Sequence, residues 1–489
     1  GDPSAWALIA TMMLTAREPT AAVVTIERAI LLEPDNAAWH ILASRAFVMA
    51  GDLKRGESSL QDAVKLNGNK DAGVLCDAGY VYTLLQKHET ANELFKEATR
   101  QQPENAIAHF NLGMNLVYLG QLKEAETSLE RSIELDKAPY PCKFEAMLSR
   151  SDLRTQTSDN NHIAELKSEL ENQLPARKTS VICYALAKEL EDLEQYRESF
   201  VFRKRGAELQ TQSFNYDVSI DVQGFDEIIS SHTRDALAGL KPGSDDKSAI
   251  FVMGLPRTGT TLTDRIISSH ADVTSAGEPH SFAAELVKLC KNQESDKSVM
   301  ATALQLNMKE LGEAYLDNIR QLVPNSPRFI DKLPLNYHYC GLISRALPQA
   351  KIVHLKRDPM DACYAIYKAL FKNAYPFSYD LETLATYYIG YRKLMAHWQE
   401  TLGETILHVH YEQLVNEPEA ESKRIFDFLN LDWQPQVLEF HTLASASTTA
   451  SAVQVRSPVS GGSIGKWKAY ESELEPLRDR LENEGVLHW

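Results

Sequence analysis

The 489-residue sequence has few of the features of a secreted or membrane-embedded chain. Its six cysteines include no CxxC pair, which argues against a disulfide framework or a zinc site and indicates buried thiols in a reducing compartment. No run of 18 apolar residues occurs, and the N-terminal residues lack the basic segment of a signal peptide. These absences predict a soluble, cytoplasmic protein with no membrane contact.

Positive charge is also scarce. The 51 Lys and Arg residues against 67 Asp and Glu residues leave a net charge of −16, which has the wrong sign for a protein that binds nucleic acid through its phosphates. A local basic pocket is still compatible with this total. With 44% hydrophobic and 24% charged residues, the composition is typical of a globular protein, and the length predicts two or more domains.

A repeat fills the first part of the chain. Successive marker positions are 34, 35 and 34 residues apart, and each is a small residue: Ala10, Ser44, Gly79 and Gly113. Small side chains suit places where two antiparallel helices approach closely, and a larger apolar residue such as Phe95 fills the gap between helix pairs. The pattern resembles the tetratricopeptide repeat.

This resemblance implies an N-terminal all-α superhelix with a concave face. It covers residues 4–137 well, and residues around Ala187, Tyr196 and Ser199 resemble a degenerate copy. Two interpretations stay open: a groove that binds a peptide or another partner, and a scaffold for self-association or for support of the second domain.

The sequence from Ser248 onward predicts a strand, a glycine-containing loop and a helix. Residues Gly254 to Thr261 have the GxxxxGK[ST] spacing of a phosphate-binding loop, but Thr260 replaces the lysine that a nucleotide triphosphatase needs. Backbone N–H groups of such a loop, with the helix dipole, favour an anionic group. Arg257 adds a fixed positive charge whose planar fork suits a tetrahedral oxyanion.

The segment PRTGTT after a strand resembles the 5′-phosphosulfate loop of sulfotransferases that use 3′-phosphoadenosine 5′-phosphosulfate (PAPS). The resemblance spans about residues 248–489 and implies an α/β P-loop-like domain with a parallel sheet. It implies PAPS as cofactor, adenosine 3′,5′-bisphosphate as its product, and no metal. The residues implied to bind the cofactor are Arg257, Thr258, Gly259, Thr260, Thr261, Arg357, Arg456, Lys466 and Trp467.

Three motifs carry the rest of this resemblance. KIVHLKRDP is similar to the family's 3′-phosphate motif, with Arg357 as the phosphate ligand and Ala365 where the family has a serine. VQVRSPVSGGSIGKWKAY resembles the loop that closes over the nucleotide. A further family serine falls on Ala452, one residue after Ser451.

The catalytic groups that the resemblance implies are Glu278, Lys332 and Arg257. Glu278 in SAGEPH has the spacing of the glutamate base in the tyrosylprotein branch, and Lys332 in IDKLPLN resembles the lysine that stabilises the leaving oxygen, together with Arg257. The alternative for Lys332 is a surface lysine paired with Asp331. His354, in an apolar strand, is interpreted as structural.

The sequence therefore predicts a multidomain chain: a repeat domain over 1–210, a connecting region over 211–247 and a sulfotransferase domain over 248–489. The predicted reaction is metal-independent, in-line sulfuryl transfer from PAPS to a hydroxyl of a protein tyrosine, a saccharide or a small molecule. Two alternatives remain. One is a repeat scaffold whose nucleotide-binding domain is inactive, which Ala365 and Ala452 keep open, and the other is a P-loop nucleotide kinase.

Overall fold

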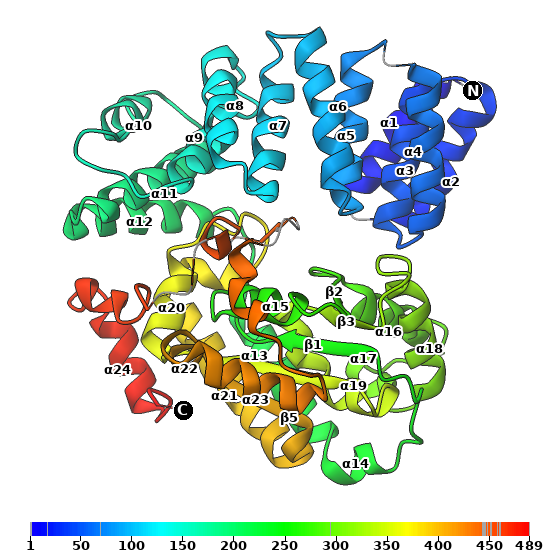
Figure 1. Ribbon diagram of the computed structural model, residues 1–489, viewed down its shortest axis with the longest axis vertical. Helices are drawn as coiled ribbons and strands as arrows, with labels where there is room; N and C mark the ends of the chain where they lie inside the picture. Colours follow the sequence, from blue (N-terminus) through cyan, green and yellow to red (C-terminus); the bar gives the residue numbers. More distant parts are fainter. Residues whose placement is uncertain are drawn as a thin grey trace. The chain divides into compact units, whose positions relative to one another are not determined.

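A computed structural model of the chain describes residues 2–16, 18–68, 70–293, 295–442, 446, 448–449, 452–456, 458 and 461–488. The chain divides into one unit of residues 1–154 and another of residues 155–443 and 448–489 (Figure 1). A buried cluster that includes Ala10, Ile26 and Phe47 belongs to the first unit, and one built around the sheet belongs to the second.

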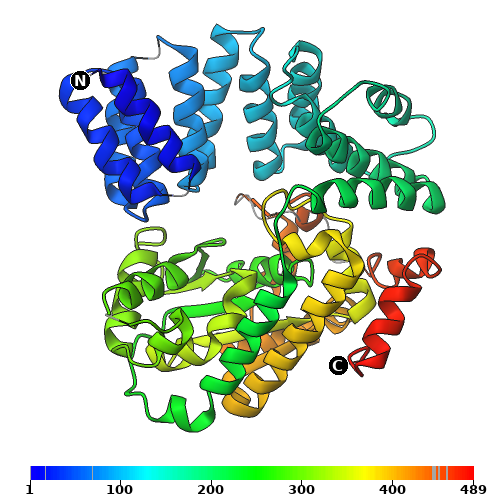
Figure 2. The ribbon, with the colours of Figure 1, turned by 180° about the vertical axis from the view of Figure 1, so that it is seen from behind.

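The first unit consists of consecutive antiparallel helices (Figure 1, Figure 2). They are α1 (Pro3–Thr15), α2 (Pro19–Leu32), α3 (Ala37–Met49), α4 (Leu53–Asn67), α5 (Ala72–Leu84), α6 (His88–Gln101), α7 (Ala106–Leu119), α8 (Leu122–Leu135) and α9 (Lys143–Asp152). A Cβ atom at Gly79 would lie 2.7 Å from the Phe95 ring, and one at Gly113 would lie 2.9 Å from Leu129. The small marker residues therefore stand where paired helices meet, which confirms the predicted helical repeat.

Three repeat-like helices belong to the second unit instead: α10 (Ile163–Glu169), α11 (Ala176–Asp192) and α12 (Tyr196–Thr211). The sequence places these helices in a repeat domain that ends at residue 210, whereas the division between the two units falls after Arg154. The boundaries at 210 and 247 stay predictions.

The second unit contains a five-stranded parallel sheet, as predicted. Its strands are β1 (Ala249–Met253), β2 (Val273–Ser275), β3 (Arg328–Asp331), β4 (Lys351–Lys356) and β5 (Ile406–His410), in the order β2-β3-β1-β4-β5. Ile250 of β1 is opposite Ile330 of β3 and Lys351 of β4. Because every pair is parallel, all five carboxyl ends lie at one edge of the sheet.

Helices follow or precede each strand. They are α13 (Val218–Ser231), α14 (Arg234–Ala238), α15 (Thr260–Ser268), α16 (Ser281–Lys291), α17 (Val299–Ala303), α18 (Met308–Ile319), α19 (Cys340–Ala346), α20 (Pro359–Tyr367), α21 (Leu381–Leu402), α22 (Tyr411–Asn416), α23 (Pro418–Leu429) and α24 (Glu475–Asn483). Short 3-10 helices are η1 (Pro334–Tyr339), η2 (Pro376–Tyr379), η3 (Gly403–Thr405), η4 (Pro435–Thr442), η5 (Gln454–Arg456) and η6 (Lys466–Tyr470). Among the described residues, no helix is both long and apolar enough to cross a membrane.

Both faces of the sheet are covered. Ile250 belongs to a buried cluster with Ile266 of α15, whereas the Phe251 ring lies 6.2 Å from that of Phe282 in α16 and 5.6 Å from that of Tyr315 in α18. Neighbouring residues of a strand point to opposite faces, so helices pack on each side. This explains why every residue of β1 is buried, as in all-parallel sheets generally.

The buried His354 and the partly buried His408 connect the strands β4 and β5. His354 Nδ1 lies 2.8 Å from His408 Nδ1, and His354 Nε2 lies 2.5 Å from the Tyr391 hydroxyl. Burial, with the positive charge of Lys356, lowers the pKa of His408 to about 4, and burial holds the pKa of His354 well below its usual value. Both imidazoles are therefore neutral at pH 7, in keeping with a structural role.

This pair predicts a pH-dependent loss of stability. The pKa of His408 is lower in the folded chain than in the unfolded chain. Its neutral imidazole therefore contributes fully to the free energy of unfolding above about pH 6.5, and this contribution is lost as the pH falls toward 4. When the pH is lowered from 7 to 5, the free energy of unfolding of the non-titrating variant His408→Gln should fall by about 1–2 kcal/mol less than that of the parent chain. Urea unfolding at both pH values measures this, and equal losses in the two proteins would contradict it.

Candidate active site

The loop between β1 and α15 forms the floor of the candidate site. Gly254 has a φ of 152° and Gly259 a φ of 103°, and Arg257 between them adopts a left-handed φ of 66°. A Cβ atom at Gly254 would lie 2.8 Å from the Leu355 carbonyl oxygen of β4, and one at Gly259 would lie 2.6 Å from the Tyr411 ring. Both glycines are thus required by backbone conformation and by space.

Backbone N–H groups line this loop. In the described part of the chain, no protein oxygen accepts a hydrogen bond from the N–H groups of Thr258, Gly259, Thr260 or Thr261. The Thr258 hydroxyl donates to the Leu255 carbonyl oxygen at 2.7 Å, which fixes the turn. Such N–H groups, with the positive end of the α15 dipole, are the donors that an anion at a helix N-terminus uses.

Arg357 reaches this loop from the end of β4. Its Nη1 donates to the Arg257 carbonyl oxygen at 2.8 Å and its Nη2 to the Ser463 carbonyl oxygen at 2.8 Å. The guanidinium also lies 4.6 Å from the centre of the Tyr411 ring, and only 7% of the residue is exposed. The Arg257 guanidinium donates to the Gln454 side chain at 2.9 Å. The two predicted arginines therefore lie beside one loop.

The Glu278–Lys332 pair lies beyond β2 and β3. The ammonium group of Lys332 is bonded to a carboxylate oxygen of Glu278, and the Lys332 N–H donates to the Gly277 carbonyl oxygen at 2.9 Å. The Lys332 side chain is 1% exposed and that of Glu278 is 38% exposed. A hydrogen bond of 3.2 Å from the Gly254 N–H to the Pro334 carbonyl oxygen joins this region to the phosphate loop.

The alternative in which Lys332 is a surface lysine paired with Asp331 is wrong. Asp331 is fully buried and accepts hydrogen bonds from the Tyr315 hydroxyl at 3.0 Å and from the Asn336 amide at 2.8 Å. Burial raises the pKa of Asp331 to about 7. Successive residues at a strand end point in opposite directions, so Asp331 faces the core while Lys332 faces Glu278.

A third acidic residue, Asp264 of α15, also belongs to this region and was missed in the sequence. It is 7% exposed, and burial raises its pKa, while Lys332 and a hydrogen bond from Ser275 act in the opposite direction. Its Oδ1 atom has no hydrogen-bond partner among the described residues. A carboxylate four residues into the helix that follows a phosphate loop was the available signal. The region therefore holds the carboxylates of Glu278 and Asp264, in addition to that of Asp331, near the buried ammonium group of Lys332.

Tyr411, directly after β5, was also missed. Its hydroxyl is 2.6 Å from the Ser463 hydroxyl, and its ring lies against both Gly259 and Arg357. The neighbouring Glu412 accepts a hydrogen bond of 2.8 Å from the Asp358 N–H. The position of these residues after a fifth apolar strand was the only signal in the sequence.

The C-terminal segment approaches Arg357 through residues Ser463 to Gly465. The Gly465 N–H donates to the Asp361 carboxylate at 2.6 Å. Arg456 lies in η5, and burial, together with Arg265, lowers its pKa to about 10. Lys466 is exposed and Trp467 half-buried in η6, and in the described part of the chain neither makes a hydrogen bond or ion pair with the phosphate loop. Their cofactor role stays a prediction.

The family serines that the sequence lacks are replaced by buried alanines. Ala365 is 6% exposed within α20, and Ala452 is 5% exposed just before η5. Ser451 lies outside the described residues.

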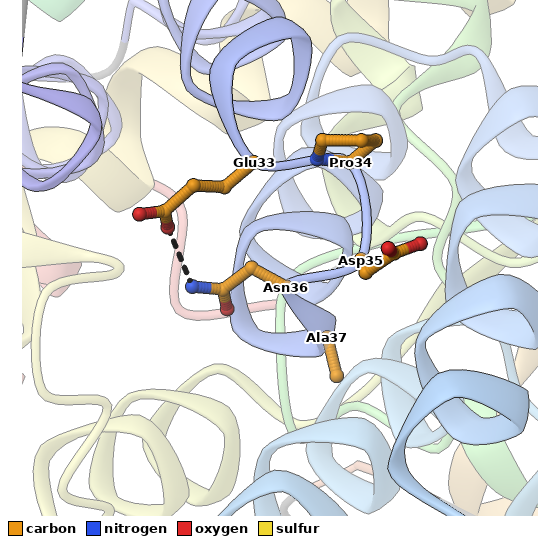
Figure 3. Close-up of a pocket in the computed structure, with 5 residues that line it drawn as sticks. All are labelled: Glu33, Pro34, Asp35, Asn36 and Ala37. Carbon is orange, nitrogen blue, oxygen red and sulfur yellow. Dashed lines mark hydrogen bonds between the residues drawn. The ribbon is translucent and has the colours of Figure 1, made fainter.

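A cavity of about 570 Å³ lies elsewhere, at the turn between α2 and α3 (Figure 3). It is lined by Glu33, Pro34, Asp35, Asn36 and Ala37, and the Glu33 carboxylate accepts a hydrogen bond of 3.0 Å from the Asn36 amide. None of the predicted catalytic or cofactor residues lines it. In the described ranges, no three His, Cys, Asp or Glu side chains gather closely enough to hold a metal ion.

Two family models match separate parts of the chain. A sulfotransferase-family model matches residues 249–435, which contain all five strands, and a tetratricopeptide-repeat model matches residues 106–139. This chain carries a sulfotransferase domain together with tetratricopeptide repeats. The predicted fold class is confirmed, and the sulfotransferase domain supports sulfuryl transfer in general.

Individual proteins are similar to this chain over parts of its length. A protein of Aquifex aeolicus (strain VF5) that is named only as uncharacterized is 28% identical over 410 residues, which are 80% of this chain and 52% of that protein. Protein-tyrosine sulfotransferase A of Caenorhabditis elegans is 26% identical over 240 residues, 45% of this chain and 60% of that protein. This chain thus spans about half the length of these relatives.

Among solved structures, the sulfotransferase domain of the Synechococcus PCC 7002 olefin synthase is 19% identical, with 47% of this chain and 89% of that chain covered and a TM-score of 0.34.

The close approach of Gly259 to Tyr411 generates a prediction for the sulfotransferase domain. Gly259→Ala should lower the stability by about 1–3 kcal/mol and displace the loop, because the new methyl group meets the Tyr411 ring. Gly485→Ala is the matched control: Gly485 has a φ of 66°, but its Cβ would meet nothing within 4 Å. Thermal unfolding of both variants measures the difference, and equal losses would contradict this role of Tyr411.

Proposed function

We propose that this chain transfers a sulfuryl group from PAPS to the hydroxyl of an acceptor. The observation that carries the proposal is the hydrogen bond of 2.8 Å from Arg357 to the Arg257 carbonyl oxygen. It places a second, buried cation beside a loop that already offers backbone N–H groups to an anion. A molecule with two anionic groups, such as PAPS, fits this arrangement better than one with a single phosphate.

The residues of the loop suit the cofactor in charge as well as in shape. The Thr258–Thr261 backbone and the Arg257 guanidinium would hold the 5′ group, and Arg357 would bind the 3′-phosphate. Thr260 in place of lysine removes the cation with which P-loop enzymes act on a γ-phosphate.

When bound, PAPS supplies an activated sulfuryl group and a stable bisphosphate leaving group. Glu278 is the proposed base: it is partly exposed, so an acceptor hydroxyl can reach it and transfer a proton to its free carboxylate oxygen. Lys332 is proposed to stabilise the leaving group, because a buried ammonium group strongly stabilises negative charge on the leaving oxygen in surroundings with little water. Arg257 would act on the same charge from the loop.

The acceptor we propose is a tyrosine hydroxyl of a protein or peptide. Tyr375 is close enough to Glu278 for that carboxylate to raise its pKa, after the larger effect of burial. Its ring lies 4.9 Å from that of Phe371 and 5.9 Å from that of Phe377, so an aromatic wall stands near the proposed base. The repeats offer a surface for a peptide, and the C. elegans relative is named for protein tyrosine.

Cofactor binding is tested by calorimetric titration with adenosine 3′,5′-bisphosphate, with and without magnesium. We expect binding that needs no magnesium and that Arg357→Ala weakens at least about tenfold, because a charge-assisted contact is lost. Arg100→Ala is the control for the loss of one positive charge, since Arg100 is exposed on α6 and pairs with the nearby Glu97. Binding of ATP that depends on magnesium would instead support the kinase alternative.

Catalysis is tested separately with Glu278→Gln. Because Glu278 contacts Lys332 and not the phosphate loop, sulfuryl transfer to a tyrosine peptide should fall about 10²–10⁴-fold while the Kd for the bisphosphate stays within about threefold. Glu285→Gln, on α16, alters a carboxylate bound by Lys288 and Asn318 and should leave both values unchanged. Binding without transfer to any tyrosine, saccharide or small-molecule hydroxyl would support the scaffold alternative.

A further inference from the structure

A single carboxylate, that of Glu191 in α11, connects four elements of the second unit. Its Oε1 atom accepts a hydrogen bond of 2.8 Å from Lys368, which directly follows α20. Its Oε2 atom accepts three more: 2.7 Å from the Tyr364 hydroxyl in α20, 3.1 Å from Arg203 in α12 and 3.1 Å from the Tyr470 hydroxyl in η6. The repeat-like helices are thus bonded directly to the sulfotransferase domain.

The surroundings of Glu191 are buried and tightly packed. Its side chain is 13% exposed, and that of Arg203 is 2% exposed. Burial would raise the pKa of Glu191, but the positive charges of Lys368 and Arg203 lower it well below its usual value. The Tyr470 ring lies 4.8 Å from that of Tyr364. Removing this carboxylate would leave the buried Arg203 and the partly buried Lys368 without their shared partner.

The segments that Glu191 joins are those that hold Arg357. Helix α20 begins two residues after Arg357, and its Asp361 accepts the hydrogen bond from the Gly465 N–H. Helix η6 begins directly after Gly465, and the preceding Ser463 accepts a hydrogen bond from Arg357. Arg357 therefore lies between two segments whose other ends meet at Glu191.

We infer that Glu191 is a positioning residue for the proposed cofactor site. Its carboxylate holds α20 and η6 together, and through them it fixes residues 461–465 against Arg357. The ligand named in this inference rests on the proposed function. The effect of Glu191 on residues 461–465 does not depend on that function. It gives the α11–α12 helix pair a role distinct from that of the repeats in the first unit: the pair is part of the binding site's support.

The test compares Glu191→Gln with Glu189→Gln in the full chain. Glu189 is a matched control on the same helix: it is fully buried and accepts two hydrogen bonds, at 2.6 and 2.9 Å, from His162, which directly precedes α10. Hydrogen exchange of residues 461–470 should become at least about tenfold faster in Glu191→Gln and stay unchanged in Glu189→Gln. Equal exchange in both variants would overturn the inference.

The link to the cofactor is measured with adenosine 3′,5′-bisphosphate. Its Kd should rise about fivefold or more in Glu191→Gln, and less than about twofold in Glu189→Gln. Tyr470→Phe removes the hydroxyl through which η6 contacts Glu191, so adding it to Glu191→Gln should change the Kd no further. Additive effects of the two substitutions would show that Glu191 does not act through η6, and an unchanged Kd would overturn its positioning role.

Failure of the proposed function would look different. A parent chain that binds no bisphosphate would contradict that function, while the exchange of residues 461–470 would still decide whether Glu191 holds this segment.

Discussion

The parallel register of five strands is the constraint on which the rest of the site depends. Strand β1 lies between β3 and β4, so the strand order reverses at β1. In open parallel sheets, ligands usually bind outside the carboxyl ends of the strands at such a point. Each strand then delivers one group to the same edge: Arg257 after β1, Glu278 after β2, Lys332 after β3, Arg357 after β4 and Tyr411 after β5. Residues as far apart in the chain as Gly259 and Tyr411 become neighbours for this reason.

The site gathers positive charge within a chain whose net charge is −16. Lys332 and Arg357 are almost fully buried, and a buried cation must be compensated. Lys332 is compensated by a carboxylate, whereas Arg357 is held by two backbone carbonyl oxygens and an aromatic ring. The charge of Arg357 also lowers the pKa of the Asp361 carboxylate in α20, against the larger effect of burial, so this guanidinium has a carboxylate nearby as well.

The features that the sequence predicts are those with a pattern in consecutive residues. The helical repeat, the loop around Gly259 and the strand before Arg357 each occupy a continuous segment with its own spacing, and the structure has repeated helices, a loop and a strand at these positions. Asp264, Tyr411 and Glu191 carry no such pattern. Their importance comes from distant partners, such as Ser463, 52 residues from Tyr411, and Tyr470, 279 residues from Glu191, which only the tertiary structure brings together.

Thr260 shows how the loop can bind an anion without the usual lysine. In a loop that carries its own lysine, one short segment supplies both the N–H groups and the mobile charge. Here the loop supplies N–H groups and Arg257, while the other cations come from the ends of β3 and β4 and are fixed by Glu278 and by the Arg257 and Ser463 carbonyl oxygens. Cations held in this way cannot follow a γ-phosphate during transfer. For the proposed cofactor, the spacing of these cations is then set by the distance between strand ends, and therefore by the elements that hold those ends, including α20, η6 and the α11–α12 pair.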